Sequence, residues 1–225
     1  MSIEVTTKDC TAVGDAELSE IADFALARGT GYDLGLLSKQ RDEWVLCTQI
    51  RNAGALVGFA FCTLERIGGT PCILLGLAVI QDGSSDRMIL NEIMAEQYRK
   101  ALLAFPDEDV LVGARIPSHL GYHIFAGLED VVPRLEHKPS GEERAWGRRL
   151  AKKFGVESKL DDRTFVVSGK GDVAGMVSYG DLMLGAEGEL EPIFSNVDRT
   201  QQDTLVAFGW AMAEHLAEGS LPPEP

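Results

Sequence analysis

Hydrophobic and polar positions between residues 43 and 105 predict three consecutive strands. The three apolar runs span residues 44–50, 55–66 and 72–80. The turns between them contain Asn52 and Gly54, and then the pair Gly68 and Gly69. Short apolar runs bounded by glycine-containing turns are typical of strands, and tight turns join antiparallel neighbours. We therefore expect an antiparallel meander of three strands.

An amphipathic helix and a fourth strand are predicted to follow the meander. The polar residues 81–86 lead into a helix that we expect to begin after an N-cap at Ser85 and to run to Ala104. Its apolar stripe contains Ile89, Ile93, Tyr98 and Leu102. A crossover helix between strands 72–80 and 110–115 predicts a parallel pair. Because Pro117 follows the second strand, we expect the two strands to separate at their carboxyl ends and leave a slot.

The residues between this strand and this helix are a candidate ligand site. Backbone N–H groups and the helix dipole at a helix N-terminus attract anions. A strand, a polar loop and a helix N-terminus in this order therefore point to a phosphate-bearing ligand.

Other segments carry helical signals. A helix is expected from Asp15, with Leu18, Ile21, Ala22 and Ala25 on one face, and a short one over 32–39. Ser140 and Glu143 have the spacing of a capping box. Trp146, Leu150 and Phe154 recur every fourth residue after it, and Gly155 can end the helix in a left-handed cap. We predict that these three apolar residues are buried.

The remaining segments are less regular. A first strand is expected at residues 3–7, and two further strands at 164–168 and 174–179, joined by a glycine-containing turn. Residues 117–139 hold either a short helix over 119–128 or an irregular insertion. A last helix is predicted over 200–218, because its apolar residues are Leu205, Phe208, Met212 and Leu216. Residues 221–225 are expected to be a frayed tail.

The order of these elements resembles that of the GNAT superfamily of acyl-CoA-dependent N-acyltransferases. Three stretches are similar to family motifs: 52–60, where a turn leads into a strand, 75–79, and the helix end at 150–156. The resemblance implies an α/β (α+β) fold, with a twisted mixed sheet, flanking helices and one parallel strand pair. It covers residues 1–180 as a GNAT-like acyltransferase domain. Residues 181–225 are then a C-terminal extension with one helix.

The resemblance also implies a cofactor site. The co-substrate would be acetyl-CoA or another acyl-CoA, with the acyl carbonyl held by the backbone of the strand that contains Leu77 and Val79. The family's pyrophosphate loop reads R/Q-x-x-G-x-G/A. The positions that correspond to this loop are Gln81, Gly83, Ser84, Ser85 and Arg87. Only Gln81 and Gly83 match the motif, and Asp86 would repel a pyrophosphate.

The catalytic groups that the resemblance implies are a base and an acid. Glu65, near the end of the second meander strand, is the carboxylate placed to act as the base. Family members use a Tyr four residues before a helix-ending Gly as the acid. Counting back from Gly155 gives Ala151, which does not ionise. If the family's helix is instead 119–128, His123 takes this place with Tyr122 beside it. His119 and His123 are then four residues apart, the spacing of two metal-ligating histidines, but without a third ligand we expect no metal site.

Composition excludes several other classes of function. The chain has 21 Lys and Arg against 35 Asp and Glu, a formal net charge of −14, so we expect no nucleic acid as a partner. No apolar run is long enough to span a membrane, and the first residues do not resemble a secretory signal. Cys47, Cys62 and Cys72 lie inside apolar strands and are expected to be buried thiols. These features favour a cytoplasmic protein.

Two hypotheses of different classes follow from the sequence. The first is an acyl-CoA-dependent N-acyltransferase that acts on a small-molecule amine or a protein amine. The second is a catalytically silent GNAT-like scaffold that serves as a binding or assembly module. The degenerate loop and Ala151 favour the second. The apolar stripe of the last predicted helix allows a homodimer in either case.

Overall fold

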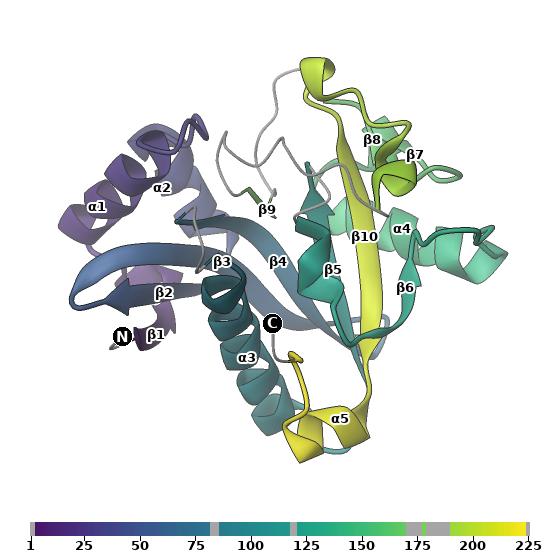
Figure 1. Cartoon of the computed structure of the whole chain (residues 1–225), viewed down its shortest axis with the longest axis horizontal. Helices are drawn as coiled ribbons and strands as arrows, with labels where there is room; N and C mark the ends of the chain where they lie inside the picture. Colours follow the sequence, from purple (N-terminus) through teal and green to yellow (C-terminus); the bar gives the residue numbers. More distant parts are fainter. Residues whose placement is uncertain (1–2, 82–85, 118–120, 170–176, 179–189, 224–225) are drawn as a thin grey trace.

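The computed structural model describes residues 3–81, 86–117, 121–169, 177–178 and 190–223. Its strands form one mixed sheet in the order β1-β2-β3-β4-β5-β10-β8-β7, with β6 paired to β10 and β9 to β4 (Figure 1). The strands are β1 (Ile3–Asp9), β2 (Leu46–Asn52), β3 (Ala55–Ile67), β4 (Thr70–Ile80), β5 (Val110–Ile116), β6 (Glu129–Val132), β7 (Leu160–Asp161), β8 (Val166–Val167), β9 (Val177–Ser178) and β10 (Thr204–Ala211). The helices are α1 (Asp15–Leu26), α2 (Leu34–Glu43), α3 (Asp86–Ala104), α4 (Gly141–Lys153) and α5 (Ala213–Glu218), with a 3-10 turn η2 (Gly121–Phe125) after β5. The predicted mixed α/β fold with flanking helices is confirmed.

Strands β2, β3 and β4 form the predicted antiparallel meander. The predicted parallel pairing of β4 with β5 is also confirmed, with Cys72 opposite Leu111 and Leu75 opposite Ala114. The pairing stops there, although β4 continues to Ile80 and β5 to Ile116. The two strands therefore separate at their carboxyl ends.

A β-bulge in β4 lies where this separation begins. The register passes from Leu77 opposite Phe61 to Leu75 opposite Cys62, so that Gly76 is the extra residue. A Cβ atom at Gly76 would lie 2.1 Å from the ring of Trp44. Glycine at this position is thus required by the indole ring that packs on the strand.

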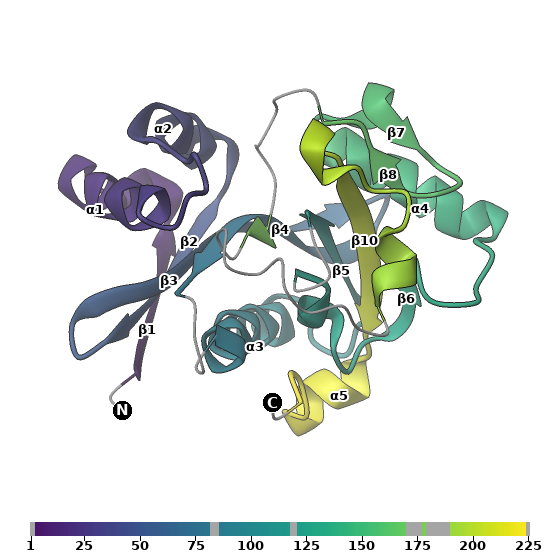
Figure 2. The ribbon, with the colours of Figure 1, turned by 45° about the horizontal axis from the view of Figure 1, so that its top comes forward.

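The helices cover both faces of the sheet. Figure 2 shows α1, α2 and α4 on one side of it, and α3 and α5 on the other. On the first side, the hydrophobic face of α1 packs on Phe59, Phe61, Leu77 and Val79. The predicted apolar residues Leu18, Ile21, Ala22 and Ala25 are all buried, as are Ile89, Ile93 and Tyr98 of α3.

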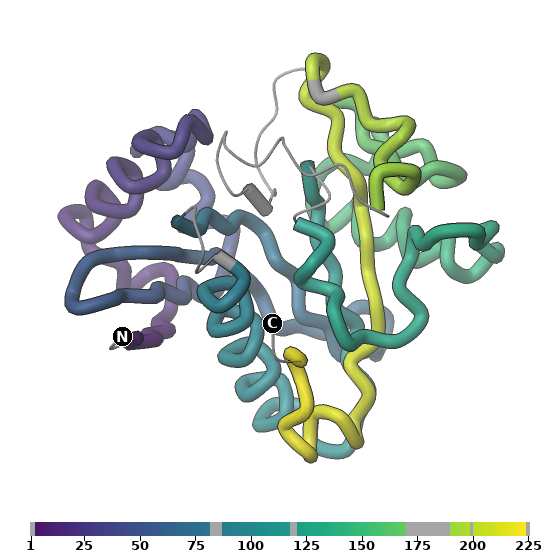
Figure 3. The backbone as a smooth tube through the Cα atoms, viewed as in Figure 1, coloured from purple at the N-terminus to yellow at the C-terminus, as the bar shows by residue number. Residues whose placement is uncertain are grey.

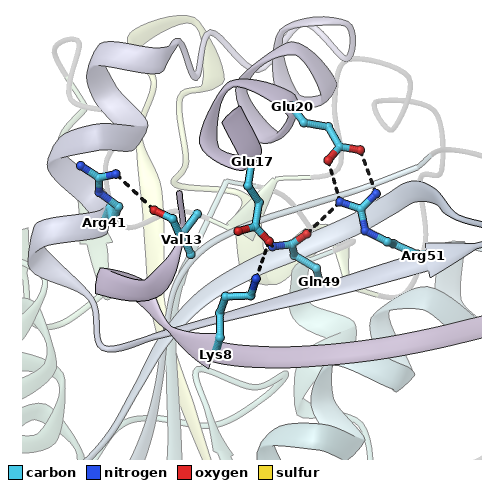
Figure 4. A network of polar contacts seen from close by, with 7 residues as sticks. All are labelled: Lys8, Val13, Glu17, Glu20, Arg41, Gln49 and Arg51. Carbon is cyan, nitrogen blue, oxygen red and sulfur yellow. Dashed lines mark hydrogen bonds and ion pairs between the residues drawn. The ribbon is translucent and has the colours of Figure 1, made fainter. Parts of the chain in front are cut away.

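A polar network ties α1 to the first two strands (Figure 4). Lys8 Nζ and Gln49 Nε2 both donate to Glu17 Oε1, at 2.7 and 2.6 Å. Arg51 forms two bonds to Glu20, at 2.8 and 2.6 Å. Because every charged group has an opposite partner, this network holds the helix in place and leaves no charge of its own to a ligand.

Helix α4 follows the sequence prediction closely. The Ser140 side chain accepts from Glu143 N at 3.1 Å, and Ser140 N donates to Glu143 Oε2 at 2.6 Å, which completes the capping box. Trp146, Leu150 and Phe154 are 7%, 0% and 9% exposed, so that all three are buried as predicted. Gly155 adopts φ 70°, the left-handed cap.

The helix predicted over residues 200–218 is wrong. Residues Thr204–Ala211 form β10, which lies inside the sheet antiparallel to β5, and only Ala213–Glu218 are helical. Nearly every residue of β10 is buried, so apolar and polar residues do not alternate along this strand. The spacing of its apolar residues therefore resembled that of a helix. The sheet therefore crosses the boundary drawn at residue 180, while the division of the chain into two domains stays a prediction. The dimer stays a prediction too, without the helix on which it was based.

Three smaller expectations also change. Of the strands predicted at 164–168 and 174–179 the described residues show Val166–Val167 as β8, paired with β7 and β10, and Val177–Ser178 as β9, paired with β4; residues 170–176 and 179 lie outside the described residues. The short helix expected over 32–39 begins at Leu34, after the N-cap Asp33, and ends at Glu43. The chain end predicted to be frayed lies beside α3 (Figure 3). Leu221 is 8% exposed, and Asn91 Nδ2 donates to Pro223 O at 2.9 Å.

Candidate functional site

The carboxyl end of β4 brings together three of the residues that the sequence singled out. Gln81 follows β4, is exposed, and donates its backbone N–H to Val57 O at 2.7 Å. Arg87 lies in the first turn of α3, and its Nη2 is 3.1 Å from Nδ1 of His123 in η2. The start of α3 and the 3-10 turn thus meet through Arg87 and His123, while Gln81 is bonded to β3. Gly83, Ser84, Ser85 and His119, with the side chain of Asp86, lie outside the described residues.

Leu77 and Val79 are both 0% exposed and pack with Phe59 and Phe61 under α1. Their side chains belong to the core, so that only the backbone of this part of β4 is available to a ligand. On the side that β5 has left, this backbone meets β9: Ala78 pairs with Val177 and Val79 with Ser178, in parallel. The slot between the two separating strands therefore receives a strand of the same chain, and β9 adds a second, short parallel pairing to the sheet.

A buried arginine near this slot was missed by the sequence reasoning. Arg115 of β5 is 1% exposed, and its Nε donates to Thr204 Oγ1 at 2.8 Å. Removing a guanidinium from water is costly, so a buried Arg marks a position under a specific electrostatic demand. The signal in the sequence was an Arg inside the otherwise apolar run Val110–Ile116.

Tyr122, one of the two candidates for the acid, points away from this edge. Its hydroxyl donates to Pro133 O at 2.6 Å, and its ring packs edge-on against Phe125 and Phe194. Burial raises the pKa of Tyr122 to about 12. The structure thus brings His123, and not the Tyr122 hydroxyl, to Arg87. Ala151, the other position considered, is buried in α4.

Glu65, the candidate base, lies at the opposite end of the strand pair. It pairs with Cys72 near the start of β4, whereas Gln81 follows the end of β4. Eight residues of extended chain separate Cys72 from Ile80, or about 26 Å. Glu65 forms an ion pair with Lys153 at the end of α4. The structure therefore does not bring Glu65 to the residues of the loop.

Glu65 instead lines a cleft of about 610 Å³ between the ends of α2 and α4. Trp44 and Phe154 form its aromatic part, with ring centroids 6.3 Å apart. The buried side chain of Gln40 accepts from Trp44 Nε1 at 2.9 Å and donates to Glu43 Oε2 at 2.8 Å. With Lys39 and Lys153 also on the wall, two ammonium groups balance the two carboxylates.

A second cleft, of about 410 Å³, lies at the other end of α4. Its aromatic walls are Trp146 of α4 and Phe208 and Trp210 of β10, and its polar rim contains Asp130, His137, Glu142 and Glu143. Burial on its own raises the pKa of Glu143, but hydrogen bonds from Ser140 and His137 outweigh it and hold the pKa below its usual value. The Glu143 carboxylate is therefore ionised at neutral pH.

Several other kinds of site find no support in the described part of the chain. No group of three His, Cys, Asp or Glu side chains in these residues is arranged to hold a metal ion. None of the helices in the described ranges is both long and apolar enough to cross a bilayer. All four cysteines are buried free thiols, as expected for Cys47, Cys62 and Cys72.

Comparison with known proteins gives structural similarity alone. No protein-family model and no curated protein matches the sequence. One similar solved structure is an acetyltransferase of the GNAT family from Streptococcus pneumoniae, with 12% identity and a TM-score of 0.36, over 60% of this chain and 93% of that chain. Another is an acyl-CoA N-acyltransferase from Pseudomonas aeruginosa, with 14% identity and a TM-score of 0.35, over 58% of this chain and 92% of that chain. The element order and the parallel strand pair expected from the resemblance are present in the described residues.

Proposed function

We propose that this chain is a binding module built on an acyltransferase-like scaffold, and not an active acyl-CoA-dependent acyltransferase. The observation that carries the proposal is the pairing of β9 with Ala78 and Val79 of β4. Backbone groups that are bonded to β9 cannot also hold an acyl carbonyl. An extended acyl-CoA chain does not fit beside β4 while β9 lies there.

The placement of the candidate catalytic groups supports the same proposal. Glu65 is bound to Lys153 at the far end of the strand pair, and the Tyr122 proton is donated to a backbone carbonyl. Of these groups only His123 lies near the strand end, where Nη2 of Arg87 is 3.1 Å from its ring. A general base must reach the proton that it removes, so the separation of Glu65 from this edge counts against acyl transfer.

Acyl transfer from acetyl-CoA or another acyl-CoA to a small-molecule or protein amine is the second candidate. The bulge at Gly76 and the separation of β4 from β5 favour it, because together they open a strand edge to a ligand. Gln81 and Arg87 border this edge. For this function β9 must leave β4.

Thermal unfolding with acetyl-CoA tests the two functions against each other. A ligand at a hundred times its dissociation constant stabilises the native state by about 2.7 kcal/mol. For a chain of this size, this raises the melting temperature by about 5–10 °C. We expect a shift of less than about 1 °C at millimolar acetyl-CoA, because the β4 edge is taken.

A variant of β9 makes the test sharper. Val177→Pro removes the N–H of a β9 residue and weakens its pairing with Ala78, while Val177→Thr keeps the N–H and serves as the matched control. We expect no acetyl-CoA shift in either variant. A shift of several degrees in Val177→Pro alone would show that the site works once β9 is released, and acyl transfer would then replace the binding module as the conclusion.

A further inference from the structure

The cleft at the start of α4 combines perpendicular aromatic walls with carboxylates. Trp146 and Trp210 have ring centroids 6.1 Å apart and an interplanar angle of 88°, so that they form a corner. Phe208, two residues before Trp210 on β10, is 1% exposed and is also among the residues around the cleft. Trp146 is 7% exposed, so that the partly exposed Trp210 presents the larger aromatic surface to the cleft.

One of these rings already contacts a cation. The guanidinium carbon of Arg149 lies 4.7 Å from the Trp146 ring centroid. The electron-rich face of an indole attracts cations, best those with a thin hydration shell. The corner between Trp146 and Trp210 offers the same attraction to a second, bound cation.

The rim charges favour a cation as well. The rim has three carboxylates, those of Asp130, Glu142 and Glu143. Arg134 lies 3.6 Å from Glu143 and 3.8 Å from Asp130. His137 lies 2.8 Å from Glu143. Arg134 and His137 thus satisfy Glu143 and part of Asp130. Glu142 is exposed and forms no ion pair with any residue in the described ranges. Its charge is available to a ligand, and it offsets the positive end of the α4 dipole.

We propose that this cleft binds an organic ammonium cation that carries methyl or methylene groups on its nitrogen. The alkyl groups pack on Trp210 and on the accessible part of Trp146, while Glu142 and Asp130 balance the charge across the rim. A hydrated metal ion gains little from indole walls, and a neutral aromatic ligand leaves the carboxylates without a counter-charge. The cleft is separate from the β4 edge, so this proposal and the proposed binding-module function fail independently.

A matched pair of probes tests the charge requirement. Choline and its neutral isostere 3,3-dimethylbutan-1-ol have nearly the same shape, and calorimetric titration of the full chain measures both. We expect choline to bind with a dissociation constant in the millimolar range or below, and the isostere to bind at least about tenfold more weakly. Absence of choline binding, or equal binding of the two probes, overturns the proposal.

Variants locate the site. Trp210→Ala removes one wall and is expected to abolish choline binding, and Glu142→Gln, at an exposed position that does not threaten folding, is expected to weaken it about threefold to tenfold. Trp44→Phe and Glu157→Gln are the controls, since Trp44 lies in the other cleft and Glu157 lines neither cleft. Choline affinity that falls equally in the controls, or that is unchanged in both test variants, places binding elsewhere and overturns the proposal. Acetyl-CoA shifts play no part in this readout.

Discussion

The two ends of helix α4 line two clefts of different character. Lys153, Phe154 and Gly155 at its end line the larger one, of about 610 Å³, where Glu65 and Lys153 form an ion pair. The first turn lines the smaller one, of about 410 Å³, with two carboxylates and the ring of Trp146. In the larger cleft the side-chain charges cancel, whereas in the smaller one carboxylates are in excess.

The difference shows that the charges lining a cleft, and not its volume alone, decide which ligand it can bind. The charges at each end of α4 complement the helix dipole, with Glu142 and Glu143 in the first turn and Lys152 and Lys153 in the last. What distinguishes the ends is the element opposite: β10 brings Trp210 to the acidic end, while β3 brings Glu65 to the basic end. The opposing strand decides whether the helix charge is cancelled or remains available.

The largest expected effect is a loss of stability of α4, the helix that lines both clefts. Leu150, in the last turn of α4, is 0% exposed and packs over Gly113 of β5. Leu150→Ala is expected to lower the free energy of unfolding by about 3 kcal/mol, because it leaves a cavity between helix and sheet. Chemical denaturation measures the loss, which corresponds to about 6–12 °C in melting temperature. Leu103→Ala is the control, since Leu103 is 72% exposed, and an equal loss in both variants would contradict the packing described here.

A second change acts at the larger cleft only. Gly76→Ala places a Cβ atom 2.1 Å from the Trp44 ring, so that the indole must move. We expect a loss of about 2 kcal/mol and a changed Trp44 environment, measured by denaturation and near-ultraviolet circular dichroism. Gly141→Ala is the control, because nothing lies within 4 Å of its added Cβ. If Gly76→Ala were as stable as wild type, the contact between Trp44 and β4 would be misplaced.

The third change acts at the smaller cleft. Ser140→Ala removes the N-cap of α4 and is expected to cost about 1 kcal/mol of unfolding free energy. Ser19→Ala, inside α1, is the matched control and is expected to change stability by less than about 0.5 kcal/mol. A Ser140→Ala variant with unchanged stability is the result that would falsify the capping box.

The smallest effect concerns Glu143 at the rim of the smaller cleft. The pKa of Glu143 lies below its ordinary value when the chain is folded, so its contribution is present above the unfolded pKa of about 4.3. That contribution disappears as the pH falls through the folded pKa. Between about pH 5 and 3, wild type is expected to lose about 0.5 kcal/mol more stability than Glu143→Gln. Parallel pH profiles for the two proteins would show that Glu143 is not coupled to Ser140 and His137.

Local signals explain why much of the fold was predictable. The meander depends on turns at Gly54, Gly68 and Gly69, each with positive φ, and α4 depends on the pair Ser140 and Glu143. These signals act between residues that are close in sequence. The candidate site was less predictable, because Glu65 of β3 pairs with Cys72 near the start of β4, whereas Gln81 follows the end of β4. Similarly, Tyr122 and His123 are neighbours whose side chains reach different partners.

The sequence by itself determined the strands expected at 55–66 and 72–80, the helix ending at Ala104 and the helix capped by Ser140, since each has its own periodicity, turn or cap. The structure extends the two strands to 55–67 and 70–80. Only the tertiary structure decided that Thr204–Ala211 is a strand, because burial on both faces removes the alternation that marks one. It also decided that β9 lies against Ala78 and Val79, and that Trp146 meets Trp210 at a right angle. Contacts between residues so far apart along the chain depend on how all the strands of the sheet are arranged, and a local sequence pattern does not predict them.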